Sequence, residues 1–214
     1  MTEKTEILRD KFIEIFLTTV DRENGDKLLD WLDNQTDFFL APASTRYHEC
    51  YEGGLVEHSI IVYYALVDLV SSCYSHLFEE INSPSIESMA IVSLLHDVCK
   101  CNMYEVEMRN KKIDGQWFEV PCYTVNEKFK MGGHGSKSLY LIQNHISLTM
   151  EEATAINCHM GVEHGKWEVL SAFRQFPLAF LLHTADMLST IPELKSLVLL
   201  RHGINPDTWI EMRA

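Results

Sequence analysis

The chain has 214 residues, 46% of them hydrophobic, which is enough for one sizeable core and allows one domain or two small ones. Its formal net charge of −13 argues against a long nucleic-acid duplex as partner, because phosphate binding needs a basic surface. Residues 1–10 are polar, and no apolar run is expected to reach the ~20 residues that cross a bilayer, so we expect a cytoplasmic protein without membrane association.

Helical patterns dominate the first half of the chain. Apolar residues at three- and four-residue spacing predict an amphipathic helix over residues 5–20, a short helix over 25–36 and a long apolar helix over 54–77. Pro84, after Ser83, predicts the first turn of another apolar helix, which runs into His96 and Asp97.

The middle of the chain departs from this pattern. Residues 104–109 alternate apolar and polar side chains, Asp114-Gly115 is a strong turn signal, and residues 116–125 form an aromatic-rich extended run. These features predict a β-hairpin lid, inserted at about 102–130 and ended by Gly132-Gly133.

Two further helix starts follow the hairpin. Thr149 and Glu152 form a capping-box pattern for a helix through Cys158, and Pro177 opens an apolar helix over residues 178–188. We therefore predict a single, mainly helical domain over residues 1–214, all-α apart from the small inserted hairpin.

A histidine and an aspartate stand side by side at the end of the apolar helix, in Leu94-Leu95-His96-Asp97. Burying a carboxylate without a partner is costly, and a bound metal ion removes the difficulty because imidazole and carboxylate are natural ligands. A single buried histidine or aspartate is better explained as a hydrogen-bonded core residue. Here, however, several predicted helices along the chain each carry one, and this repetition favours a shared metal site. The candidate metal ligands are His58, His96, Asp97, His134, His159 and Asp186.

The order His…His-Asp…His…His…Asp resembles the HD-domain metal-dependent phosphohydrolases, over roughly residues 46–190. The fragments that carry the resemblance are Gly-Gly-Leu-Val-Glu-His at 53–58, Leu-Leu-His-Asp-Val-Cys-Lys at 94–100, Gly-His-Gly-Ser-Lys-Ser at 133–138 and His-Met-Gly at 159–161. The chain is similar to small stand-alone HD hydrolases of bacteria and phages and to the HD domain of bacterial 3′–5′ exoribonucleases. The resemblance implies an HD-type helical bundle.

The resemblance also implies roles for the ligands. His58, His96, Asp97 and Asp186 would hold a first divalent ion, and His134 and His159 a second, with Asp97 bridging both. One or two ions of Mn, Fe, Co, Ni, Zn or Mg would then supply a metal-bound hydroxide that attacks a phosphoester. Asp97 and Lys100, one helical turn apart, are the expected catalytic residues.

The expected substrate is small, phosphorylated and nucleotide-like. Lys100 and Lys137 are candidate phosphate contacts, Arg46 and His48 precede the first ligand, and the hairpin offers side chains that could stack on a base. The candidate substrate-binding residues are Arg46, His48, Lys100, Arg109, Trp117, Tyr123 and Lys137. For each, solvation or packing is the competing explanation.

Other interpretations stay open at this point. Related folds also serve di-iron oxygenases with a similar ligand order, and a non-catalytic metal-binding regulatory module is a third possibility. Cys99 and Cys101 flank Lys100 and could form a soft-metal pair, but a single such pair is weak, and we expect both thiols to be reduced and packed in the core.

Overall fold

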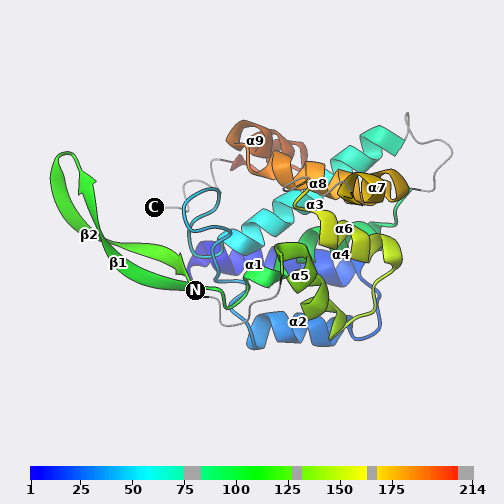
Figure 1. The fold of residues 1–214 in the computed structure, drawn as a ribbon, viewed down its shortest axis with the longest axis horizontal. Helices are drawn as coiled ribbons and strands as arrows, with labels where there is room; N and C mark the ends of the chain where they lie inside the picture. Colours follow the sequence, from blue (N-terminus) through cyan, green and yellow to red (C-terminus); the bar gives the residue numbers. More distant parts are fainter. Residues whose placement is uncertain (75–82, 127–131, 163–167, 207–214) are drawn as a thin grey trace.

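The computed structural model describes residues 1–74, 83–126, 132–162 and 168–206. In these ranges the chain is mainly helical, with one antiparallel pair of strands (Figure 1). The elements are α1 (Glu3–Thr19), α2 (Gly25–Asn34), α3 (Gly54–Tyr74), α4 (Ile86–Leu95), a short 3-10 helix η1 (Val98–Lys100), β1 (Tyr104–Ile113), β2 (Gln116–Val125), α5 (His134–Gln143), α6 (Met150–Cys158), α7 (Glu168–Gln175), α8 (Pro177–Ser189) and α9 (Pro192–Arg201).

Local signals account for most helix starts. The Thr149–Glu152 capping box is present at α6, and Pro177 lies in the first turn of α8, both as predicted. The prediction that Pro84 lies in the first turn of α4 is wrong. The hydroxyl of Ser85 caps this helix by accepting from the amide of Ser88 at 3.0 Å, so Pro84 precedes the cap. The separate helices α7 and α9 were not predicted.

Helix α3 forms the centre of the core and packs against α4 and α8. Its apolar side chains, among them Leu55, Ile61 and Leu66, are fully buried. By length and composition residues 54–72 could cross a membrane, contrary to the expectation that no segment would. Most of that segment is buried inside the helical body, which explains why it is apolar nearly all round.

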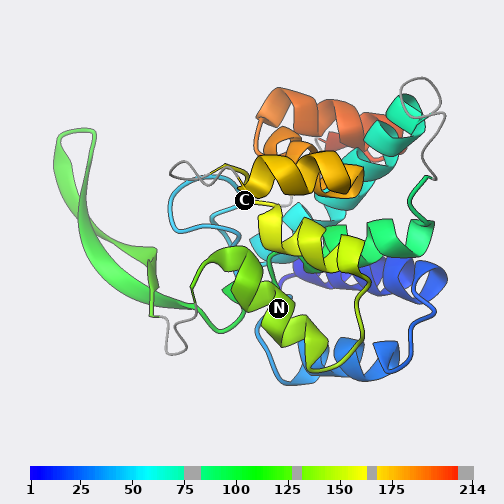
Figure 2. The same cartoon turned by 45° about the vertical axis from the view of Figure 1, so that its right-hand side comes forward.

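The hairpin extends away from the helices as a two-stranded arm (Figures 1 and 2). Its strands pair in register from Tyr104 with Val125 to Ile113 with Gln116, and Asp114 and Gly115 make the turn with φ of 49° and 87°. The hairpin itself is thus confirmed. Most of its residues are exposed, so its outer half does not cover the helical body as the predicted lid would. The predicted end of the insertion, at 127–130, lies outside the described residues.

A buried charge network joins the two ends of the described chain to α3. Glu57 is fully buried. Its carboxylate forms ion pairs with the ammonium groups of Lys4 on α1 and Lys195 on α9, each at 2.6 Å. Lys195 also contacts Glu49 at 2.7 Å, and the Tyr51 hydroxyl donates to Glu57 at 2.7 Å. Buried carboxylates need such partners, and this pairing fixes the residue next to His58.

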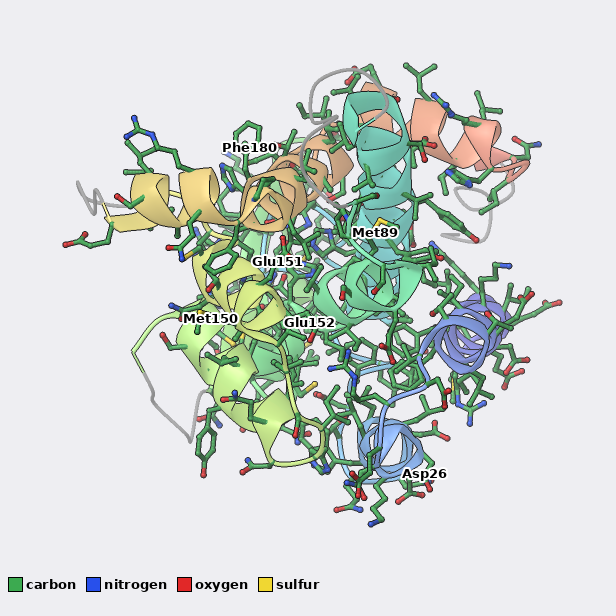
Figure 3. The ribbon with its side chains drawn as sticks, turned by 90° about the vertical axis from the view of Figure 1, so that its right-hand side faces the viewer. Asp26, Met89, Met150, Glu151, Glu152 and Phe180 are labelled. Carbon is green, nitrogen blue, oxygen red and sulfur yellow. The ribbon has the colours of Figure 1, made fainter. Side chains whose placement is uncertain are left out.

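A second group of ion pairs connects the turn before α2 with helices α4 and α6. Arg22, just before α2, donates to both carboxylate oxygens of Glu152, at 3.0 and 3.1 Å, and to Glu87 of α4 at 3.0 Å. Glu152 also accepts from the Ser88 hydroxyl at 2.8 Å. Figure 3 shows Glu151 and Glu152 in the first turn of α6 and Met89 near the start of α4.

Candidate metal centre

Six polar residues converge in the helical body although they span residues 58 to 186. His58 lies on α3, His96 ends α4 and Asp97 follows it directly. His134 is the first residue of α5 and His159 ends α6, while Asp186 lies on α8. Helix ends therefore supply four of the six side chains, and the apolar helices around them exclude water from most of the cluster.

The first set of donors surrounds one oxygen of the Asp97 carboxylate. Oδ2 of Asp97 lies 3.5 Å from His96 Nε2 and 3.7 Å from His58 Nε2. The two imidazole nitrogens are 3.2 Å apart, and Oδ1 of Asp186 lies 3.1 Å from His58 Nε2 and 3.9 Å from His96 Nε2. Four donor atoms thus face a common point.

The second set surrounds the other oxygen of the same carboxylate. Oδ1 of Asp97 lies 3.6 Å from His159 Nε2 and 4.0 Å from His134 Nδ1. His58, His96, Asp97 and His159 are at most 3% exposed, whereas the side chain of His134 is 40% exposed. Asp97 therefore stands between two donor sets, which His159 links because its donor atom also lies within 4.8 Å of those of His96 and Asp186. At the second set, His134 borders solvent.

Hydrogen bonds behind the rings fix which nitrogen faces the centre. His96 Nδ1 lies 2.8 Å from the Ser93 carbonyl, and His159 Nδ1 lies 2.7 Å from the Ile156 carbonyl. A carbonyl can only accept, so Nδ1 carries the proton and a neutral ring leaves Nε2 with a free lone pair. His183 supports His159 from behind, because its Nδ1 lies 2.7 Å from the His159 carbonyl.

The electrostatics favour ligand protonation states at His96 and Asp97, whereas the contact with Asp97 raises the pKa of His134 to about 10, so that ring must lose a proton before it can bind a metal. Burial lowers the pKa of His96 to about 4, so its imidazole is neutral at pH 7. Burial alone would raise the pKa of Asp97, but the Lys100 ammonium and the His96 ring outweigh it and hold that pKa well below its usual range. Asp97 is therefore a carboxylate, as a ligand must be.

The residues present fit a metal ion. Nε2 of His159 is buried and has no hydrogen-bond partner in the part of the chain that the structure describes, although it faces the centre. Such an orphaned atom is costly unless something occupies the point toward which it aims. Together, the buried histidines and aspartates lie close enough to hold a metal ion.

Both candidate lysines are close to the centre or to its ligands. Lys100 is largely buried, and its ammonium lies 2.6 Å from Oδ2 of Asp97. Lys137 lies one turn after His134 on α5 and is also buried. The neighbouring Ser138 accepts the backbone N–H of Cys99 at 3.0 Å, which holds η1 against α5.

A groove of about 770 Å³ lies between the loop of residues 45–52 and one side of the hairpin, from Val106 near its base to Lys111. It brings together three of the predicted substrate residues, Arg46, Arg109 and Tyr123, and adds Lys111. His48, on the same loop, points elsewhere: its ring lies 4.9 Å from the His58 ring, and its Nδ1 lies 2.7 Å from Glu49. The loop therefore connects the groove to a residue of the metal centre.

Trp117 lies apart from this groove. It pairs with Lys112 near the turn of the hairpin and is 69% exposed. Its register places it at the outer end of the arm, whereas Tyr123 pairs with Val106 near the base, and both of those residues line the groove. Of the two predicted stacking residues, only Tyr123 is in the groove.

A second cavity, of about 840 Å³, opens beside His134 at the start of α5. Asn157, Gly161 and Glu168 are among its lining residues, and none of the lining residues described is a lysine or arginine. The groove along the hairpin is the better match for an anionic substrate, because its lining holds two arginines and a lysine against one carboxylate, that of Glu52.

Three contributors were not predicted as site residues. Glu49 lies beside His48 and His58, with donor atoms of all three within 4.8 Å of one another, and Cys99 lies in a similar group with Asp97 and His134. Lys111 lines the groove. The position of Cys99 two residues after Asp97 could have predicted a third donor there. No local sequence pattern distinguishes Glu49 or Lys111 from other charged residues.

Comparisons of this chain with protein-family models, with curated proteins and with solved structures found no match. An assignment of function therefore depends on the residue pattern and on the geometry of the site.

Proposed function

We propose that this protein is an HD-type metal-dependent phosphohydrolase that cleaves the phosphoester of a nucleotide or a short nucleotide ester in the cytoplasm. The observation that carries the proposal is the position of Asp97. One of its oxygens faces His58 and His96, with Asp186 beside them, and the other faces His134 and His159. A structural carboxylate does not need two separate donor sets, whereas a carboxylate shared by two cations does.

The residues would divide into two sets. His58, His96, Asp97 and Asp186 would hold one divalent ion, and Asp97, His134 and His159 a second. The chemistry that divalent ions supply in such a donor set is polarisation of the phosphoryl group and activation of water near neutral pH. Zinc, iron, cobalt, nickel and manganese all accept imidazole and carboxylate, so the donor set suits them better than magnesium, which prefers oxygen ligands.

The side chains around the centre have complementary tasks. The ion pair with Lys100 keeps Asp97 ionised, and the Lys100 ammonium would also meet a phosphate oxygen of the substrate. Arg46 and Arg109 line the groove and would bind the charge of the substrate, while Tyr123 offers a ring on which a base can stack. His48 packs on the His58 ring and would orient it.

Metal analysis of the purified protein, followed by a phosphate-release screen over nucleotides with Mn²⁺, Fe²⁺, Co²⁺ and Mg²⁺, tests the proposal. We expect one or two equivalents of metal and hydrolysis of a small nucleotide ester. Arg46→Ala and Arg109→Ala should each raise KM. Lys112→Ala is the control, because it also removes one positive charge from the hairpin but lies outside the groove, and it should leave KM unchanged.

Two results would contradict the proposal. If the purified protein binds no divalent ion, the six residues do not form a metal centre. Iron-dependent O₂ uptake without phosphate release would favour oxygenase chemistry on the same ligands.

A further inference from the structure

Cys99 places a thiol at the second donor set. Its Sγ lies 3.6 Å from Nδ1 of His134 and 3.9 Å from Oδ1 of Asp97, and the residue is buried. The three donor atoms all lie within 4.8 Å of one another. Nε2 of His159, the orphaned buried nitrogen, faces the same Asp97 oxygen at 3.6 Å. A sulfur atom thus joins the donor atoms of His134 and Asp97 in one group, beside the same Asp97 oxygen that His159 faces.

We propose that Cys99 is a ligand of the second metal subsite, which therefore selects a thiophilic ion such as Zn²⁺, Co²⁺ or Fe²⁺ and excludes Mg²⁺. This inference rests on the proposed function, because it assigns the chemistry of one half of the same metal centre. On binding, the thiol forms a metal–sulfur bond and gives up its proton to solvent, so no oxidant or reductant is involved.

The observed spacings suit a tetrahedral ion. Ligand bonds of about 2.0–2.3 Å arranged tetrahedrally separate the donor atoms by about 3.4–3.6 Å. The Cys99–His134 and Asp97–His159 separations are both 3.6 Å, whereas the Cys99–Asp97 and His134–Asp97 separations, at 3.9 and 4.0 Å, would each shorten by a few tenths of an ångström on binding. Octahedral magnesium would need shorter separations and oxygen donors.

The alternative is that Cys99 is a packed core thiol with a weak contact to Asp97. Cys101, two residues later, is such a case: it is buried, and it belongs to none of the groups of described side chains that are close enough to hold a metal ion. The two residues share chain segment, residue type and burial, and they differ in their neighbours. Cys101 is therefore the matched control for Cys99.

The test uses Co²⁺ as a spectroscopic probe in the full chain. Wild type and Cys101→Ser should show a thiolate-to-cobalt charge-transfer band in the near ultraviolet, and Cys99→Ser should lose it. Cys99→Ser should also lose about one of two equivalents of bound metal. X-ray absorption on the Zn²⁺-loaded wild-type and Cys101→Ser proteins should show a sulfur scatterer at about 2.3 Å, which decides the question even if Cys99→Ser does not fold.

The outcomes separate this inference from the proposed function. Co²⁺ that binds in an Asp97-dependent manner without a sulfur band or sulfur scatterer would overturn the role of Cys99 and leave the metal centre intact. A band that persists in folded Cys99→Ser would do the same. No Asp97-dependent Co²⁺ binding at all would overturn both.

Discussion

The Lys100 ammonium lies 2.6 Å from Oδ2 of Asp97, the same oxygen that faces His58 and His96. One carboxylate oxygen therefore serves both a fixed cation of the chain and the first set of donors. The pair is almost wholly buried, so the interaction is little screened by solvent. The position of Lys100 makes it a counter-charge for Asp97 and the nearest described cationic side chain to that oxygen.

Lys100→Ala should retain the bound metal but lower kcat by about 100-fold, because it removes a charge that would stabilise the transferring phosphoryl group. Metal content and kcat of the variant, measured side by side, check this. Lys27→Ala, on the exposed side of α2, is a suitable control because Asn24 is the only hydrogen-bond partner of Lys27 among the described residues. Loss of metal in Lys100→Ala would mean that Lys100 organises the ligands rather than contacting substrate.

Asp97→Ala should remove metal from both subsites and abolish activity, since both of its oxygens face donor sets. The helical fold should persist, because the surrounding apolar side chains are unchanged, although the unpaired Lys100 will cost about 3 kcal/mol of stability. Metal analysis and circular dichroism together check this prediction. Full metal content in a folded Asp97→Ala protein would show that the carboxylate is only structural.

Gly135→Ala should disturb the second donor set selectively. A Cβ atom at Gly135 would lie 2.3 Å from the Asn157 carbonyl oxygen, so α5 must move away from the end of α6. His134 and His159 would then separate, and we expect loss of about one metal equivalent together with a lower Tm. Gly132→Ala is the matched control, because a Cβ there meets nothing within 4 Å. Equal metal content in both variants would contradict the assignment of His134.

Acid should destabilise the protein through Glu152. Burial alone would raise the pKa of this carboxyl, but hydrogen bonds from Arg22, Thr149 and Ser88 lower it below the ordinary 4.5. A depressed folded-state pKa contributes stability that is present above pH 4.5 and is lost as the pH falls toward the folded-state pKa. Glu152→Gln should therefore lose about 2 kcal/mol of unfolding free energy at neutral pH and flatten the acid dependence.

Urea unfolding near pH 7 and near pH 4 checks the role of Glu152. Glu151 is the matched control, since burial raises its pKa instead and Glu151→Gln should not reproduce the loss. A Glu152→Gln protein with unchanged stability at neutral pH would show that the Arg22 pair contributes nothing.

The negative charge of the protein should restrict it to small substrates. The net charge of −13 repels long polyanions, and the groove offers only Arg46, Arg109 and Lys111 as described cations, enough for one or a few phosphates. We expect turnover on a nucleotide panel to exceed turnover on a long single strand at matched phosphate concentration and physiological salt. Processive degradation of the long strand, with no activity on the panel, would favour an exoribonuclease-like function instead.

Features encoded locally could be predicted from the sequence. The Asp114-Gly115 turn and the capping box of Thr149 each involve a few neighbouring residues, and both are present. Pro192 begins α9 by the same signal that marks Pro177, so that helix could have been predicted; α7 contributes no fully buried residue and has no such start.

Features that depend on tertiary packing could not be read from the sequence. The groove requires the hairpin base to lie against the loop at Arg46, and the outward course of the hairpin separates Trp117 from Tyr123. The place of Asp97 between two donor sets agrees with the bridging role that the family resemblance implied. Nothing in the order of residues shows that Cys99 lies at one of these sets and Cys101 does not.

The pairing of Glu57 with Lys4 and Lys195 has a consequence for how this protein can be divided. The residue next to His58 is neutralised from α1 and from α9, both outside the stretch 46–190 that carries the ligand pattern. A fragment cut to that stretch would keep every proposed ligand but would bury a carboxylate stripped of both cations. The smallest fragment expected to fold with the candidate site intact is therefore longer than the ligand pattern, because it includes helices α1 and α9.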